Sequence, residues 1–70
     1  MTLEEFFAHP SFVREMRRMT TIGVEAKIVG NQVTLSRGIA LIPHETVDLF
    51  AQRLLELARM AGVSIVVVRE

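Results

Sequence analysis

The dipeptide Gly30-Asn31, flanked on both sides by alternating apolar and polar residues, most constrains the fold of this chain. Gly-Asn between two such segments is typical of a β-hairpin, because both residues tolerate a positive φ angle. A turn here places Ile28 opposite Val33 on one face and Lys27 opposite Thr34 on the other. Because this register and the hydrophobic pattern agree, the sequence predicts two antiparallel strands. The remaining pairs in this register are Ala26–Leu35 and Glu25–Ser36.

The residues after the hairpin predict a further extended segment. Arg37-Gly38 interrupts the second strand, which indicates a bulge or bend. Ile39-Ala40-Leu41-Ile42 is an uninterrupted apolar run, so we expect the chain to continue as an extended, buried segment until Pro43 ends it.

A long amphipathic helix follows Pro43. Seven apolar residues recur at spacings of three and four positions over four turns, which is the period of a helix with one buried face. Gly62 stands where a left-handed residue commonly ends such a helix. Leu49 and Leu55 lie off the apolar stripe and Met60 lies beside it, so we expect these residues to widen the buried face or to contact a partner. The stripe residues are Val47, Phe50, Ala51, Leu54, Leu57, Ala58 and Ala61.

The last segment, residues 63–69, predicts a strand with two apolar faces. Such a strand is typical of positions that are covered on both sides or lie in the middle of a sheet. As a bare edge it would be a template for aggregation. The preceding helix allows it to run parallel to the second strand through a right-handed crossover. The sequence leaves open whether it pairs with the second strand or with the first.

The first 21 residues predict two short helices. Thr2 and Glu5 have the spacing of a capping box, and apolar residues at helical spacing follow them. Pro10 cannot donate to the preceding turn, and it biases the residue before it away from helical angles. We therefore expect a helix over residues 3–8, a break, and a second helix over residues 11–20 that starts at Pro10 or the next residue.

Together these elements predict an α+β fold, a two-layer sandwich in the order α-β-β-α-β with a three-stranded mixed sheet. The 70 residues allow a single domain, with a helical segment over residues 1–21 and a ββαβ core over residues 22–70. Half of the residues are hydrophobic, and the net charge is zero. Because a domain of this size buries only about 60% of the surface that its unfolded chain exposes, we expect oligomerisation to extend or cover the sheet.

These features predict a small non-enzymatic module that binds itself, as a homodimer or higher oligomer, or another protein. The N-terminus is acidic, and no apolar run approaches the roughly 18 residues of a membrane span, so we expect a soluble, cytoplasmic protein. The candidate interface combines the last strand, the two off-stripe leucines and the Phe-rich start of the chain. Its residues are Ile65, Val66, Val67, Val68, Leu49, Leu55, Phe6 and Phe7.

A cluster of arginines supports an alternative function. Arg14, Arg17 and Arg18 lie on one side of the second helix, and Arg37 adds to this patch from the bend after the hairpin. Doubled in a two-fold dimer, the patch suits contact with a nucleic-acid backbone or another anion. Three glutamates in the same segment balance the three arginines, and the chain has no Tyr or Trp on which bases could stack. Nucleic-acid binding therefore ranks second to protein binding.

His44 and Glu45 form a third candidate site. They open the long helix after an apolar segment, where α/β units bind ligands at exposed backbone N–H groups. Histidine can act there as an acid or base near neutral pH. The same two residues equally suit the ordinary first turn of a helix. With two histidines, no cysteine and no third ligand at metal spacing, the sequence predicts no metal site, and we expect no cofactor.

Overall fold

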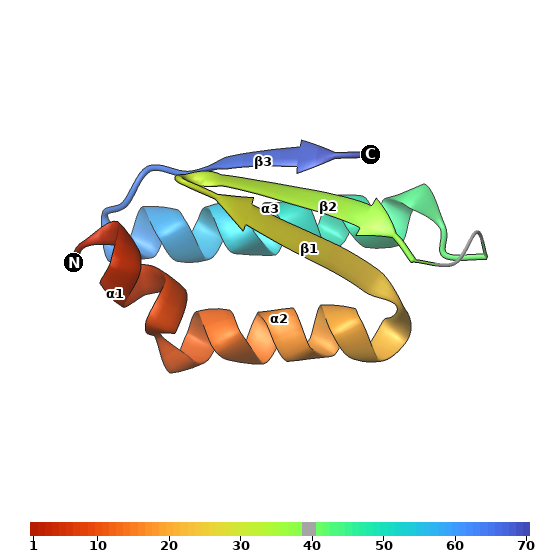
Figure 1. Ribbon diagram of the computed structural model, residues 1–70, viewed down its shortest axis with the longest axis horizontal. Helices are drawn as coiled ribbons and strands as arrows, with labels where there is room; N and C mark the ends of the chain where they lie inside the picture. Colours follow the sequence, from red (N-terminus) through yellow and green to blue (C-terminus); the bar gives the residue numbers. More distant parts are fainter. Residues whose placement is uncertain (39–40) are drawn as a thin grey trace.

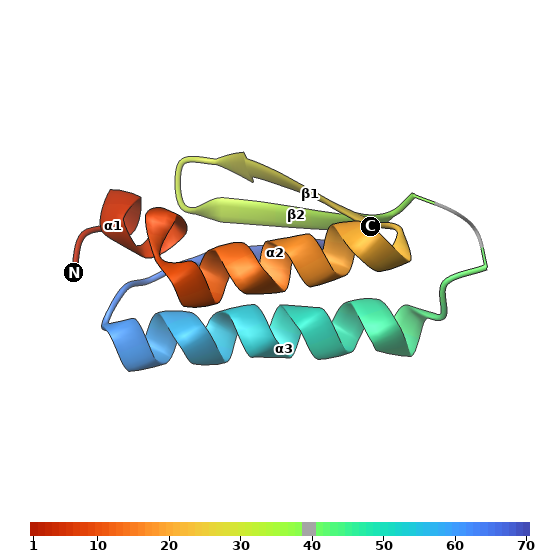
Figure 2. The same ribbon diagram turned by 90° about the horizontal axis from the view of Figure 1, so that it is seen from below.

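The computed structural model describes residues 1–38 and 41–70, and these form three helices and one three-stranded sheet (Figure 1). The elements are α1 (Leu3–Ala8), α2 (Pro10–Ile22), β1 (Val24–Val29), β2 (Gln32–Arg37), α3 (His44–Ala61) and β3 (Val66–Arg69). Helices α2 and α3 lie side by side on one face of the sheet, with α2 against β1 and α3 against β2 and β3 (Figure 2). This arrangement confirms the predicted α+β fold, in the order α-α-β-β-α-β.

Strands β1 and β2 form the predicted antiparallel hairpin. Ile28 pairs with Val33, and every other pair along the hairpin also has the predicted register. Within the turn only Gly30 has a positive φ angle, of 60°. A type II′ turn requires a positive φ only at its first central residue, so Asn31 needs none. The turn sets the register, and the register places Val24, Ala26, Val33 and Leu35 on the face that packs against the helices.

β3 is an edge strand that runs parallel to β2, and the sheet order is β1-β2-β3. It spans Val66–Arg69, so the prediction that the strand begins at residue 63 is wrong. Gly62 ends α3 with a φ of 72°, and the Val63 N–H donates to the Ala58 carbonyl oxygen at 3.0 Å. The residues up to Ile65 then carry the chain from the helix layer to the sheet, and pairing starts only where they end.

The extended, buried run predicted after the hairpin is wrong where the structure describes it. The Gly38 N–H donates to the carbonyl oxygen of Gly23, at 2.7 Å, and Gly23 directly precedes β1. Because β1 begins directly after Gly23, the residues that follow Gly38 have no residue of β1 to pair with. Leu41 lies in a turn and is 90% exposed, whereas Ile42 is buried. Positions 39 and 40 of the run lie outside the described residues.

The N-terminal helices begin and end close to their predicted positions. Thr2 and Glu5 form the capping box, in which the Glu5 N–H donates to Thr2 Oγ1 and the Thr2 N–H donates to Glu5 Oε1. His9 has extended backbone angles and separates α1 from α2, and its Nδ1 accepts a hydrogen bond from the Ser11 N–H. α2 begins at Pro10 and continues two residues beyond the predicted end.

The hydrophobic core lies between the sheet and the two long helices. The rings of Phe6, Phe7 and Phe12 close one end of it, with centroids 5.0–5.6 Å apart. This aromatic cluster ties α1 and the start of α2 to the rest of the molecule. The most deeply buried side chains are Met19, Val24, Val33, Leu35 and Leu54.

Candidate functional site

The sheet has one face that no element of the described residues covers, the face turned away from α2 and α3 (Figures 1 and 2). Val29, Gln32 and Val66 lie in one row across it, because Gln32 pairs with both valines. Val29 is 63% exposed and Val66 is 50% exposed. Further along the hairpin this face carries Lys27 beside Thr34. Its apolar surface is therefore concentrated at β3 and the adjoining end of the hairpin.

β3 also presents an unpaired edge. β2 occupies one of its sides, and the other side has no strand neighbour within the described residues. Edge strands of natural proteins commonly carry charges that prevent pairing with other chains. β1, at the opposite edge, carries Glu25 and Lys27, whereas β3 has only valine before Arg69. The unprotected edge of β3 is therefore the candidate surface for pairing with another strand.

One side of α3 lies next to this edge. Asp48 Oδ1 accepts a hydrogen bond of 3.1 Å from the Arg69 guanidinium of β3. Leu55 follows Asp48 by two helical turns on the same side and is 45% exposed. Leu49 lies on another side, because six residues at about 100° each place it about 120° from Leu55 around the helix. The two leucines that the sequence grouped together therefore do not share one flat surface.

The other predicted interface residues differ in how accessible they are. Phe6 and Ile65 are buried in the core of their own chain. Phe7, Val67 and Val68 are partly buried. The predicted interface residues that stay exposed are Leu49, Leu55 and Val66.

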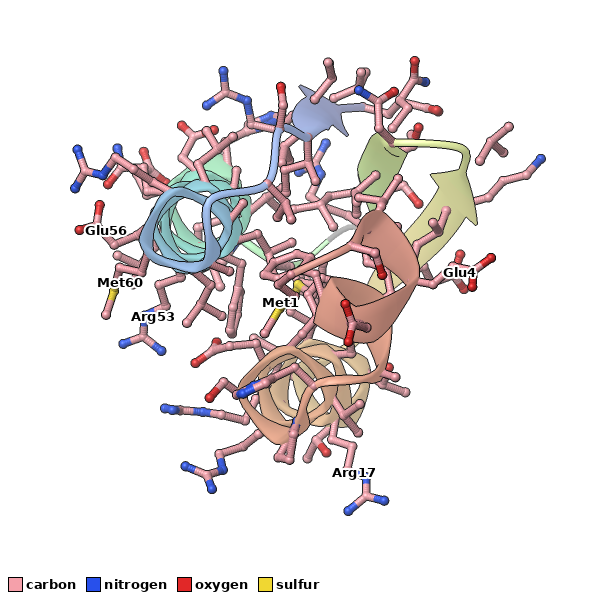
Figure 3. All side chains as sticks on the ribbon, turned by 90° about the vertical axis from the view of Figure 1, so that its left-hand side faces the viewer. Met1, Glu4, Arg17, Arg53, Glu56 and Met60 are labelled. Atoms are coloured by element: carbon pink, nitrogen blue, oxygen red, sulfur yellow. The ribbon has the colours of Figure 1, made fainter. Side chains whose placement is uncertain are left out.

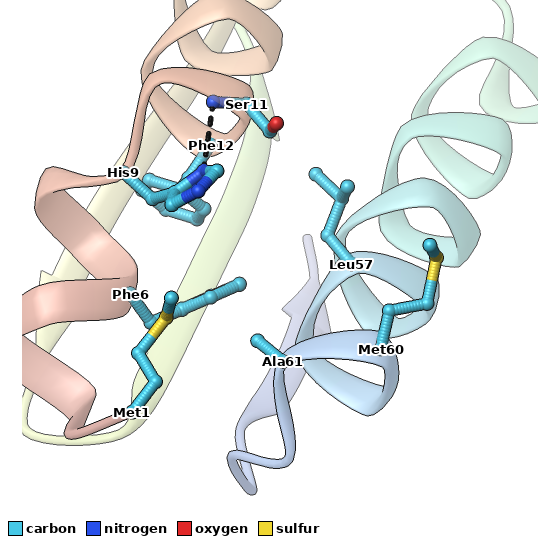
Figure 4. Close-up of a pocket in the computed structure, with 8 residues that line it drawn as sticks. All are labelled: Met1, Phe6, His9, Ser11, Phe12, Leu57, Met60 and Ala61. Atoms are coloured by element: carbon cyan, nitrogen blue, oxygen red, sulfur yellow. Dashed lines mark hydrogen bonds between the residues drawn. The ribbon is translucent and has the colours of Figure 1, made fainter.

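The predicted interface left out several exposed apolar side chains, among them Val29 and Met60. Val29 is the one apolar residue on the outer face of β1, where Glu25 and Lys27 precede it. Met60 is 77% exposed near the end of α3, where it lines the pocket between this helix and the N-terminal segment (Figure 4). The break in the polar pattern of β1 could have identified Val29. The sequence places Met60 beside the apolar stripe, but its exposure could not be predicted from that position because it depends on where α2 packs.

The structure places three of the four predicted arginines together. Arg14, Arg17 and Arg18 line a shallow groove on α2, and Arg17 points away from the rest of the molecule (Figure 3). Arg37 has a different role, because its guanidinium donates to the Ile42 carbonyl oxygen at 3.2 Å. This hydrogen bond holds the chain that leads into α3, so Arg37 acts there as a structural residue.

Arg53 of α3 joins the arginine cluster, which the sequence could not indicate because the two helices are distant in the chain. The Glu15 side chain is 14% exposed and lies 3.7 Å from the Arg18 guanidinium and 3.6 Å from that of Arg53. Arg53 also stacks over the Phe50 ring, with 5.9 Å to its centroid. Glu15 thus neutralises part of the cluster and links α2 to α3.

His44 and Glu45 occupy the first turn of α3, and both are exposed. Pro43 precedes them and provides no side-chain hydrogen bond to the helix end. Within residues 1–38 and 41–70, no hydrogen bond or ion pair joins either side chain to another group. The same residues contain no group of three or more His, Asp and Glu side chains placed to hold a metal ion.

A pocket of about 230 Å³ lies between the N-terminal segment and the end of α3 (Figure 4). Its lining is mostly apolar and includes Phe12, Leu57 and Met60. The polar side chains in it are those of His9 and Ser11, and the His9 ring is already engaged in capping α2. The pocket is a gap between packed elements and does not bring reactive groups together.

Comparisons with protein-family models, with curated proteins and with solved structures find no match to this chain. In the part of the chain that the structure describes, no helix is long and apolar enough to cross a membrane.

Proposed function

We propose that this protein is a small self-associating interaction module, which acts by binding a second copy of itself and not by catalysis. The observation that carries the proposal is the free edge of β3, where three consecutive valines precede Arg69 and no other strand of residues 1–38 and 41–70 pairs with them. Such an edge offers a row of unpaired backbone N–H and C=O groups to any strand that reaches it. Pairing two copies satisfies these groups and removes the exposed Val66 from water.

The size of the uncovered face limits how such a module can associate. Three strands spaced about 4.8 Å apart and about six residues long give the face a footprint of roughly 280 Å². A stable interface buries about 800 Å² on each partner. Stacking two sheets face to face is therefore insufficient, and an interface at β3 must also include the neighbouring side of α3.

The direct test is the mass of the protein in solution. Sedimentation at micromolar concentration should give at least twice the monomer mass of 7.9 kDa. Val66→Lys should reduce this mass, because it places a charge within the pairing edge. Leu41→Lys is the matched control, because it adds the same charge at an exposed apolar residue in the loop before α3. A wild-type monomer over this range, or a Val66→Lys variant that keeps the full mass, contradicts the proposal.

Nucleic-acid binding is the second candidate function. The observation that favours it is the groove where Arg14 and Arg17, which make no ion pair within the described residues, lie beside Arg18 and Phe50. A protein that contacts phosphates through these arginines loses affinity steeply as the salt concentration rises. Arg17→Ala should then weaken binding to a duplex and flatten its salt dependence. Absence of binding at low salt removes this candidate.

A further inference from the structure

We propose that two copies associate about a two-fold axis, β3 pairing antiparallel with β3 and α3 packing antiparallel on α3, so that Asp48 of each copy meets Arg59 of the other. This inference rests on the proposed self-association and specifies its geometry. The product is a continuous six-stranded sheet in the order β1-β2-β3-β3-β2-β1, with all the long helices on one face. Its second copy is the same chain, so the interface is isologous.

The position of α3 suits this arrangement. α3 packs against both β2 and β3, so we place its axis beneath this pair of strands. Adding a second β3 at the usual strand spacing of about 4.8 Å places the two α3 axes about 10 Å apart. This distance is close to the 8–10 Å at which helices pack through their side chains. Strand pairing at β3 therefore brings the two helices into contact without a change in the fold.

The side of α3 that faces the partner is complementary to itself. Asp48, Gln52, Leu55 and Arg59 are spaced as i, i+4, i+7 and i+11, which places them in one stripe along the helix. An axis midway between Gln52 and Leu55 is also midway between Asp48 and Arg59. Two antiparallel copies of the stripe thus bring Gln52 against Leu55 and Asp48 against Arg59 at the same time, with two copies of each pair in the dimer.

The same axis suits β3. Asp48 is level with Arg69, to which it is hydrogen-bonded, and α3 runs opposite to β3 (Figure 1). The axis lies about 8 Å along α3 from Asp48, which corresponds to about two and a half strand residues before Arg69. An axis through Val67 satisfies this spacing within about 2 Å. It also pairs Val66 with the partner's Val68, so that side chains of the outer face meet each other.

The ion pairs already present are compatible with the new one. Asp48 is bonded to Arg69, and Arg59 is bonded to Glu56 one turn before it. Bringing Asp48 to Arg59 of the partner subunit links these pairs into a chain of alternating charges. The Asp48 side chain is 49% exposed and that of Arg59 is 75% exposed, so both remain free to reach across the axis.

A charge swap tests the orientation. Asp48→Arg places Arg against Arg in its own homodimer, and Arg59→Asp places Asp against Asp, so each variant alone should dimerise about ten-fold more weakly or worse. In an equimolar mixture, the arginine introduced by Asp48→Arg in one copy faces the aspartate introduced by Arg59→Asp in the other. The unchanged Arg59 of the first variant and Asp48 of the second face each other at the second, symmetry-related pair. The mixture should therefore recover dimers close to wild-type affinity. Glu4→Arg and Arg14→Asp are the matched controls, because they make the same charge changes on α1 and α2, outside the stripe.

Cysteine cross-linking supplies a second measurement that does not depend on charge. The chain has no cysteine of its own. A mixture of Gln52→Cys and Leu55→Cys should form a disulfide between the two variants, whereas Leu49→Cys mixed with Met60→Cys, on another side of α3, should not. Failure of both the charge rescue and the cross-link, with a wild-type dimer, overturns this geometry and leaves self-association standing. A wild-type monomer overturns both.

Discussion

Leu54→Ala, compared with Leu55→Ala, separates the fold of the single chain from its association. The two leucines are adjacent on α3, so both substitutions remove the same atoms and make the same small change in helix propensity. Leu54 is fully buried between the helices and the sheet, whereas Leu55 is 45% exposed beside β3. The two variants therefore differ in burial alone.

The structure sets the expected magnitudes. Truncating a fully buried leucine to alanine costs about 2–5 kcal/mol, because it removes the transfer free energy and leaves a cavity. A chain of 70 residues has a free energy of unfolding of roughly 4–10 kcal/mol in total. A loss of about 3 kcal/mol lowers the Tm of a domain this small by roughly 12–24 °C. Leu55→Ala leaves the isolated chain within about 0.5 kcal/mol of the wild type.

Thermal unfolding followed by circular dichroism at low and high protein concentration is the assay. Leu54→Ala should lower the Tm at both concentrations, because its cavity lies inside one chain. Leu55→Ala should lower the Tm only at high concentration, where the dimer contributes to stability by mass action. Equal effects of the two substitutions at low concentration would refute the assignment of Leu54 to the core. A Leu55→Ala effect that does not depend on concentration would exclude this leucine from the interface.

Three further predictions concern local features of the backbone and the first helix. Gly62→Ala should destabilise the protein by about 1 kcal/mol in denaturant unfolding, because the residue has a φ of 72° that alanine adopts with strain. Gly38→Ala should also be destabilising, since a Cβ there would lie 2.7 Å from the Gly23 carbonyl oxygen; unchanged stability would show that this end of the hairpin can open. Hydrogen bonds from the Thr2 backbone and side chain hold the pKa of the Glu5 carboxyl below its usual value. The stability they contribute is therefore present above the ordinary glutamate pKa and is lost as the pH falls through the lowered one, and NMR titration should show the Glu5 pKa rising in Thr2→Ala.

The elements that could be predicted from the sequence are those set by neighbouring residues. The turn at Gly30 and the period of two fix the hairpin register, and both act within a dozen residues. The helical stripe and Gly62 fix α3 in the same local way. The elements that could not be predicted depend on distant partners. β2 ends where β1 has no more residues, and β3 starts at Val66 because the chain must first leave the helix layer.

The candidate site follows the same division. The apolar character of Val66 and Leu55 is visible in the sequence, but their exposure depends on where the helices and strands pack. Ile65 belongs to the same apolar run as Val66 but is buried, because it lies where the chain enters the sheet. Arg37 is close to the other arginines in the prediction and is held by the Ile42 carbonyl in the structure. Arg53 shows the reverse case, a residue that only the packing of α3 on α2 brings to the cluster.

The two edges of the sheet explain why association at β3 should stop at a defined size. An exposed edge strand can recruit copies without limit when each added copy presents the same edge again. Antiparallel pairing of β3 with itself uses both valine edges in a single step. The edges that remain are the two β1 strands, which carry Glu25 and Lys27 and resist pairing. The pattern that predicted a central strand is compatible with a strand at the edge of one chain, since β3 would become central in the proposed dimer.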